Sequence, residues 1–217
     1  KKAIKETLDA NGMDNDTHIR LTLTRGEKVT SGMDARLNQS GCCLIVLAEW
    51  KKKVYDFSQG IRAISSSIRR SIPAFLDSKI HHNNMLSLVI AKIHANIAGY
   101  DAAVMLDERG FVAELNDTNL FMLKGDTVFT PFAHACLPGI TRQTFIDLLK
   151  DNKMKVQERD LSLVEFINAD LVFATGTNGE ITPVTEMDGR EIKCNMTFLE
   201  KIKNLFESKL PSLCEPL

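Results

Sequence analysis

The sequence predicts a protein of mixed helices and strands, in the α/β (α+β) class. An amphipathic segment ends at Gly12, as a helix does, and residues 19–25 then alternate large and polar side chains like a half-buried strand. Between residues 102 and 130, four short apolar runs are separated by turn sequences at 107–110 and 124–126, which favours an antiparallel meander. Helical and strand-like segments then alternate to the C-terminus, which favours a layered fold.

Other segments have their own signals. Residues 43–50 are largely apolar, which predicts a buried strand, and residues 84–97 place apolar side chains at helical spacing before Gly99. The C-terminal alternation predicts a helix over 141–151, strands over 155–160, 171–175 and 181–186, a helical turn over 162–168 and a last helix over 197–208.

Composition excludes several classes of partner. The 217 residues include 27 Lys and Arg against 28 Asp and Glu, so that no basic excess indicates nucleic acid or anionic lipid. No apolar run approaches the roughly 20 residues of a membrane span, and the N-terminus lacks the apolar core of a signal peptide. We therefore expect a soluble protein in the cytoplasm or another intracellular compartment. The five cysteines and five histidines show no metal-binding spacing, so no metal is expected.

Two turn segments carry the strongest functional signal. In the sequence Leu-Pro-Gly-Ile-Thr-Arg, residues 137–142, Gly139 permits a tight turn and Thr141 supplies a hydroxyl where a helix begins. The free N–H groups of a helix start bind anions. The sequence Thr-Gly-Thr, residues 175–177, again combines a glycine with hydroxyls beside a turn. Together the two segments predict a site for one phosphate group.

These two segments resemble the class IV aminotransferases, which are pyridoxal 5′-phosphate enzymes. The resemblance runs from about residue 18 to residue 192 and implies a two-domain fold of that type, with a truncated small domain. We expect residues 1–55 to be the remainder of the small domain, 56–78 the connection, and 79–217 the large cofactor-binding domain. By analogy with the family we also expect a homodimer.

The resemblance also implies a lysine that binds the cofactor as a Schiff base and a glutamate that bonds its ring nitrogen. The lysine is Lys79, which the family pattern places three or four residues before an Asn. Counting back from Asn84 without a gap, however, puts Ile80 or His81 at that position. Two alternatives follow: an insertion that still delivers Lys79, or loss of the lysine. The glutamate is Glu114.

The remaining site residues follow from the same resemblance. Leu137 is expected to pack on the cofactor ring, and an arginine is expected to bind the substrate carboxylate through its planar fork. Arg20 resembles the arginine of branched-chain enzymes, and Arg25 resembles that of D-amino acid enzymes. The residues expected to bind the cofactor phosphate are Ile140, Thr141, Gly176 and Thr177.

The expected reaction is transamination between an amino acid, of the branched-chain or D-amino acid type, and a 2-oxo acid. A lyase of the same family and a catalytically impaired remnant are the alternatives. The truncation, the uncertain register of the lysine and the missing tyrosine favour the remnant. The sequence shows three departures from the family pattern. The chain begins after the family's phosphate-binding arginine, Met85 (or Asn84) occupies the position of a tyrosine that bonds the cofactor, and Thr118 occupies that of its supporting glutamate.

Overall fold

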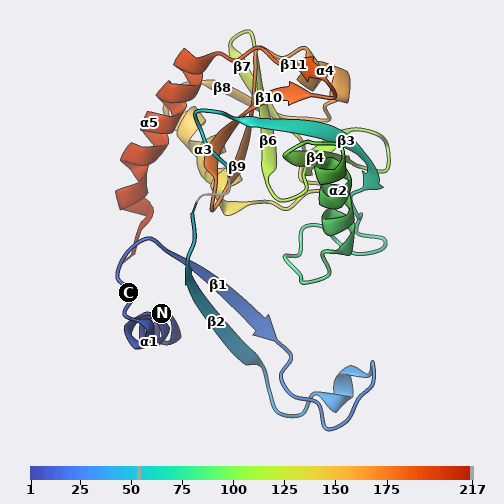
Figure 1. Ribbon diagram of the computed structural model, residues 1–217, viewed down its shortest axis with the longest axis vertical. Helices are drawn as coiled ribbons and strands as arrows, with labels where there is room; N and C mark the ends of the chain where they lie inside the picture. Colours follow the sequence, from blue (N-terminus) through green and yellow to red (C-terminus); the bar gives the residue numbers. More distant parts are fainter. Residues whose placement is uncertain (53–54, 216–217) are drawn as a thin grey trace. The chain divides into compact units, whose positions relative to one another are not determined.

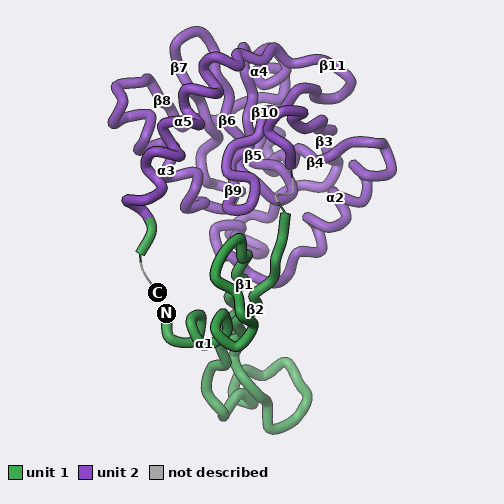
Figure 2. The backbone as a smooth tube through the Cα atoms, turned by 60° about the vertical axis from the view of Figure 1, so that its left-hand side comes forward, with its two compact units in different colours: residues 1–52, 214–217 green, residues 53–213 purple. Residues whose placement is uncertain are grey.

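The computed structural model describes residues 1–52 and 55–215, and Figure 1 labels its helices and strands. The chain divides into two compact units, which Figure 2 colours separately. The smaller unit contains residues 1–52 and the C-terminal end from residue 214, and the larger unit contains residues 53–213. Residues 56–78, expected to connect two domains, include a strand of the larger unit's sheet.

The smaller unit is built from one helix and one hairpin. Helix α1 (Lys2–Asn11) ends on Gly12, whose φ of 61° lies in the left-handed region, as predicted for a glycine that ends a helix. Strands β1 (Thr17–Thr24) and β2 (Cys43–Trp50) pair antiparallel along their full length, and the short 3-10 helix η1 (Ala35–Leu37) lies between them. Helix α1 packs against β2.

The prediction that β2 is buried is wrong. Leu44, Ile45, Leu47 and Trp50 are each more than half exposed. The sheet of this unit has only two strands, and α1 has no buried residue of its own. An apolar strand becomes buried only when a further layer covers it, and in the described part of this unit the contact with α1 leaves these four side chains exposed.

The larger unit is organised around a nine-stranded sheet. Its strand order is β5-β4-β3-β10-β9-β6-β7-β8, and β11 pairs with β10. The pairs β3–β4, β3–β10 and β7–β8 are parallel, and the others are antiparallel. The strands are β3 (Ile61–Arg69), β4 (Ala102–Leu106), β5 (Val112–Leu115), β6 (Asn119–Lys124), β7 (Thr127–Thr130), β8 (Lys155–Glu158), β9 (Leu171–Gly176), β10 (Glu180–Met187) and β11 (Arg190–Glu191).

The predicted meander is only partly correct. Strands β4 and β5 form one antiparallel pair and β6 and β7 another, but β6 pairs with β9 instead of β5. The reason lies in the turn between β5 and β6, where the Leu115 N–H donates to the Thr118 carbonyl and the Asn116 N–H donates to the Ala103 carbonyl. This turn directs the chain to a different place in the sheet, and its residues reach the candidate site described below.

Helices pack on the sheet of the larger unit, as Figure 1 shows for α2 beside β4. Helix α2 (Leu86–Ile97) contacts β3 and β4 and buries Ala91 and Ala95, whose small side chains allow close approach. Helix α3 (Ile140–Asp151) contacts β8, β9 and α5 (Met196–Leu213), and Phe145 stacks on Phe206 at 4.6 Å between ring centroids. Helix α4 (Leu163–Ile167) begins with a capping box formed by Ser162 and Glu165.

The aromatic core beneath α3 gives a test of packing. Phe173 is fully buried and stacks on Phe121 at 5.1 Å between ring centroids. Because truncation leaves a cavity, Phe173→Ala should lower the free energy of unfolding by about 3–5 kcal/mol. Val164→Ala on exposed α4 should change it by less than about 0.5 kcal/mol. Equal effects in urea unfolding would contradict this placement of the core.

Candidate active site

A cavity of about 370 Å³ in the larger unit collects side chains from several elements. Two residues predicted from the sequence, Glu114 and Leu137, both line it, whereas Lys79 does not. The lining residues come from the end of β3, the loop before α2, α2 itself, the β5–β6 region and the turn before α3. They are Arg70, Ser78, Ile80, His81, His82, Met85, Leu88, Val89, Lys92, Ile93, Glu114, Asn116, Asp117 and Leu137.

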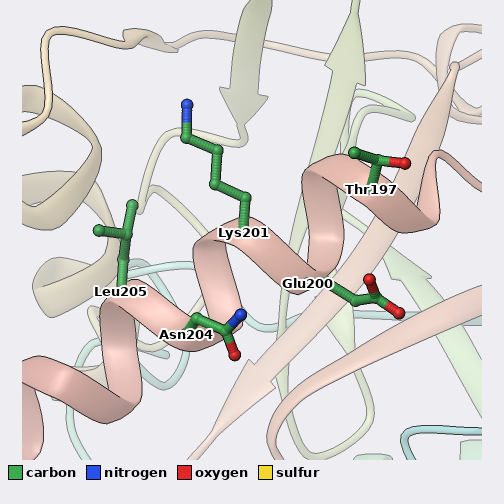
Figure 3. Close-up of a pocket in the computed structure, with 5 residues that line it drawn as sticks. All are labelled: Thr197, Glu200, Lys201, Asn204 and Leu205. Atoms are coloured by element: carbon green, nitrogen blue, oxygen red, sulfur yellow. The ribbon is translucent and has the colours of Figure 1, made fainter.

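A second hollow, of about 470 Å³, lies on helix α5. All five residues that line it come from this one helix, and Figure 3 shows Lys201 and Glu200 pointing in different directions. Ligand sites in proteins usually have polar groups that converge from several elements. We therefore assign the candidate active site to the first cavity.

Glu114 is the most strongly bonded acidic side chain of this cavity. Its Oε1 lies 2.8 Å from Nη2 of Arg70, and its Oε2 accepts a hydrogen bond from Nδ2 of Asn119 at 3.0 Å. The Leu137 N–H also donates to the carboxylate, at 3.3 Å. Glu114 is 6% exposed and Arg70 is 8% exposed. A carboxylate held by three donors in a buried site has a defined position and orientation.

Burial raises the pKa of Glu114 to about 7, because desolvation disfavours its charged form. The Arg70 guanidinium and the Leu137 N–H act in the opposite direction, since both favour the ionised carboxylate. Arg70 is itself anchored, because its Nε donates to the Ala135 carbonyl at 3.2 Å. The effect of burial outweighs these two contacts, so the pKa of Glu114 lies above its ordinary value of 4.5.

Asn119 connects this carboxylate to the turn before α3. Its Nδ2 donates to the Leu137 carbonyl at 2.9 Å as well as to Glu114, and it pairs with Thr175 across strands β6 and β9. A Cβ added to Gly139 would collide with Asn119 Oδ1. The Asn119 side chain thus contacts both the Glu114 carboxylate and the Leu137–Gly139 turn. The backbone of Asn119 lies beside the segment that ends in Gly176.

The two predicted phosphate-binding segments meet at the start of β6. A Cβ on Gly176 would lie 2.8 Å from Cγ2 of Thr118, the residue next to Asn119. Helix α3 begins at Ile140 with Gly139 as its N-cap, and no side chain caps it. The first-turn N–H groups of such a helix have no intrahelical acceptor, which leaves them available to an anion.

A buried hydroxyl also supports an anion site here. Thr175 is 2% exposed, and its Oγ1 has no hydrogen-bond partner among the described residues. Buried hydroxyls normally have partners, so an oxygen ligand beside Gly176 would satisfy this one. Glu114, Leu137 and the two glycine segments therefore fit the ring and phosphate of a pyridoxal 5′-phosphate cofactor. Ile140 is 87% exposed and Thr177 is also exposed, which leaves both accessible.

Lys79 is not brought together with these groups. Its Nζ lies 3.8 Å from Oδ2 of Asp77, and its side chain is 46% exposed. In the same loop, Ser78, His81 and His82 line the cavity instead. The role of Lys79 in covalent cofactor binding stays a prediction from the sequence.

The two candidate substrate arginines belong to the smaller unit. Arg20 lies on β1 and Arg25 directly follows it, and both are exposed. Their role in carboxylate binding also stays a prediction.

Arg142, which ends the first predicted phosphate-binding segment, is buried. Its Nη2 donates to the Glu158 carboxylate at 2.6 Å and to the Pro131 carbonyl at 2.8 Å. It anchors α3 to the end of β8.

Sequence reasoning missed Arg70 and Asn119. Local sequence offers no reliable signal for Arg70, because the buried positions of β3 change from Ile61 and Ala63 to Ser66 and its register with β4 shifts between Ser65 and Arg69. An arginine on a buried face needs an acidic partner, and the structure shows that Glu114 supplies it. The sequence around Asn119 also has no signal, since its two partners lie on separate elements.

The buried Arg70–Glu114 pair can be tested by removing one charge. Arg70→Met leaves the Glu114 carboxylate without its cation, which should lower the free energy of unfolding by about 3–5 kcal/mol. The double variant Arg70→Met, Glu114→Leu should recover part of that loss, because no unpaired charge remains. Urea unfolding of all four proteins gives the coupling. Additive effects would show that the pair is not coupled.

The raised pKa of Glu114 predicts a pH dependence. The Glu114 carboxyl of the folded chain stays protonated up to about pH 7, whereas in the unfolded chain it ionises near its ordinary pKa of 4.5. Its contribution to the free energy of unfolding is therefore complete below pH 4.5 and is lost as the pH rises to about 7. Glu114→Gln removes this titration. The unfolding free energy of the unsubstituted chain minus that of the variant should therefore fall between these pH values, and a constant difference would contradict the assignment.

Comparison with known proteins places this chain in a family. Residues 1–187 match the family described as Amino-transferase class IV. Branched-chain-amino-acid aminotransferase-like protein 2 of Arabidopsis thaliana is 55% identical over 88% of this chain and 34% of that protein. A putative branched-chain-amino-acid aminotransferase of Methanocaldococcus jannaschii is 37% identical over 94% of this chain and 70% of that protein. The chain thus spans about a third of the length of the Arabidopsis relatives.

Solved structures agree with the fold. The branched-chain amino acid aminotransferase of Escherichia coli superimposes with a TM-score of 0.85 at 29% identity, over 95% of this chain and 69% of that one. The T.th. enzyme of the same name, complexed with N-(5′-phosphopyridoxyl)-L-glutamate, gives 0.82 at 31% identity, over 95% and 68%. The expected two-domain aminotransferase type of fold is confirmed. This chain belongs to the class IV aminotransferase family.

Proposed function

We propose that this chain is the cofactor-binding part of an aminotransferase that uses pyridoxal 5′-phosphate to transfer an amino group between an amino acid and a 2-oxo acid. The observation that carries the proposal is the contact of Asn119 with both Glu114 and the Leu137–Gly139 turn. These are the groups that the ring nitrogen and the phosphate of such a cofactor require.

Each residue has a distinct part in this proposal. Glu114 accepts a hydrogen bond from the ring nitrogen, and Leu137 packs on the ring. The N–H groups of Ile140 and Thr141 bind the phosphate at the start of α3, with Gly176 and Thr177 opposite. When bound, the cofactor withdraws electrons from the substrate carbon that loses its proton. Arg70 favours the ionised form of Glu114, which is the form that accepts a hydrogen bond from a protonated ring nitrogen.

The relatives favour a branched-chain amino acid as the substrate. The Arabidopsis and Methanocaldococcus relatives both bear that name, and Arg20 on β1 is the matching candidate for binding the substrate carboxylate. Arg25 is the alternative, in which case a D-amino acid is the substrate.

We also propose a homodimer, as the sequence resemblance implies. No helix in the described part of the chain is long and apolar enough to cross a membrane.

A second function, cofactor binding with little turnover, is favoured by the position of Lys79. An aminotransferase needs an amine at the cofactor to move the substrate proton. Lys79 is ion-paired with Asp77 and lies outside the cavity lining. A product assay separates the two functions, because only an active enzyme converts a 2-oxo acid into an amino acid.

The cofactor proposal is tested by titrating the chain with pyridoxal 5′-phosphate. Gly139→Val should weaken binding at least tenfold, because the added side chain displaces Asn119 from Glu114 and Leu137. The control Gln143→Ala, one turn later on exposed α3 surface, should stay within about twofold. The reaction is followed as the formation of glutamate from 2-oxoglutarate, with leucine as the amino donor in one assay and D-alanine in the other. Absent binding, or equal affinity of both variants, would contradict the proposal.

A further inference from the structure

His82 brings an unpaired polar atom to the candidate active site. The residue lies in the loop before α2, lines the cavity and is half-buried. Its Nδ1 is buried and has no hydrogen-bond partner among the described residues. Buried side-chain nitrogens normally have a partner, because removing a polar atom from water without replacing its hydrogen bond is unfavourable. An atom of this kind beside a cavity indicates a contact with the ligand.

Two other polar side chains from the loop and from α2 are held by the protein itself. Ser78 donates its hydroxyl to the Ser71 carbonyl, and Nζ of Lys92 donates to the Asp101 carbonyl. Of the described residues that line the cavity, only His82 has a buried side-chain polar atom without a partner. The cavity can therefore form one more hydrogen bond at this position.

A hydroxyl is the ligand group that suits this nitrogen best. The Nδ1 of an imidazole carries a hydrogen in one tautomer and a lone pair in the other, so it either donates or accepts. A hydroxyl can do both, whereas an ionised carboxylate can only accept and an ammonium group can only donate. The match with a hydroxyl therefore holds for either tautomer of His82.

The proposed placement of the cofactor directs its ring hydroxyl to this side of the cavity. The ring nitrogen, the hydroxyl and the phosphate arm stand on alternate atoms of the pyridine ring, so they point in three evenly spaced directions. In the proposed function the nitrogen meets Glu114 and the phosphate lies at the start of α3. The third direction is left to the loop before α2 and to α2 itself, which supply most of the remaining lining.

We propose that Nδ1 of His82 binds the ring hydroxyl of the pyridoxal 5′-phosphate cofactor. The inference rests on the proposed function, because it places the ring and the phosphate in the same site, and it adds His82 to the cofactor-binding residues. In the family pattern a tyrosine bonds the cofactor, and here Met85 or Asn84 occupies its position. Met85 lines the cavity but has no hydrogen to donate. His82 supplies a hydrogen bond from the preceding loop.

The contact is tested with two ligands that differ only in the ring hydroxyl. One is 4-deoxypyridoxine 5′-phosphate, which keeps the ring nitrogen, the hydroxyl and the phosphate but has no aldehyde, so that only non-covalent contacts determine its affinity. The other ligand carries hydrogen in place of the hydroxyl. Each is titrated into the purified chain by calorimetry. The ratio of the two dissociation constants reports what the hydroxyl contributes in each variant.

Three variants locate the partner of the hydroxyl. His82→Leu removes both ring nitrogens and should reduce the advantage of the hydroxyl-bearing ligand about three- to tenfold, as loss of one hydrogen bond does. His82→Asn should keep the parent ratio within about twofold, because an amide atom bonded to Cγ takes the position of Nδ1. His94→Leu is the matched control and should also keep the parent ratio, since this histidine of α2 is exposed and does not line the cavity.

The outcomes distinguish this inference from the proposed function. Equal affinity of the parent chain for the two ligands, an unchanged ratio in His82→Leu, or the same loss in His82→Asn would overturn the contact and leave cofactor binding standing. If His82→Leu does not fold, His82→Gln replaces it with the same expected loss, because its amide lies one bond further from the backbone. Failure of the parent chain to bind both 4-deoxypyridoxine 5′-phosphate and pyridoxal 5′-phosphate would overturn both proposals.

Discussion

The buried ion pair of Arg70 and Glu114, together with Asn119, is the constraint on which the site depends. The two side chains lie 2.8 Å apart at 8% and 6% exposure, so that loss of Glu114 would leave a buried guanidinium without its ion-pair partner. Asn119 then connects the carboxylate to the turn that begins α3. A buried network with all members bonded fixes side-chain positions, because each alternative arrangement leaves a polar group without a partner.

This network explains how the sheet positions the cavity. Arg70 directly follows β3, Glu114 is on β5, and Asn119 begins β6. Because β6 pairs with β9 instead of β5, the turn between β5 and β6 faces the cavity, and Asn119 meets the segment that ends in Gly176. The same departure from a simple meander brings the carboxylate and the two predicted phosphate-binding segments to one place.

Most helices and strands were predictable from local sequence. The helices at Leu86–Ile97, Ile140–Asp151 and Met196–Leu213 follow their apolar spacing, and the two turn segments indicated the family. Strand pairing and burial were not predictable in the same way, because they depend on distant elements. Apolar β2 is exposed because, in the described part of its unit, the contact with α1 leaves most of its apolar side chains uncovered. The role of Arg70 becomes clear only when Glu114 is seen beside it. Lys79 shows the same limit, because the sequence does not indicate its ion pair with Asp77 or its absence from the cavity lining.

The central claim is that the Glu114 network orients a phosphopyridine ligand in this cavity. A crystal structure of the chain with pyridoxamine 5′-phosphate tests it most directly. The account predicts the ring nitrogen within hydrogen-bond distance of Glu114, the phosphate at the start of α3 between Gly139 and Gly176, and Lys79 still beside Asp77. A ligand bound elsewhere, or one whose ring nitrogen faces away from Glu114, would contradict it.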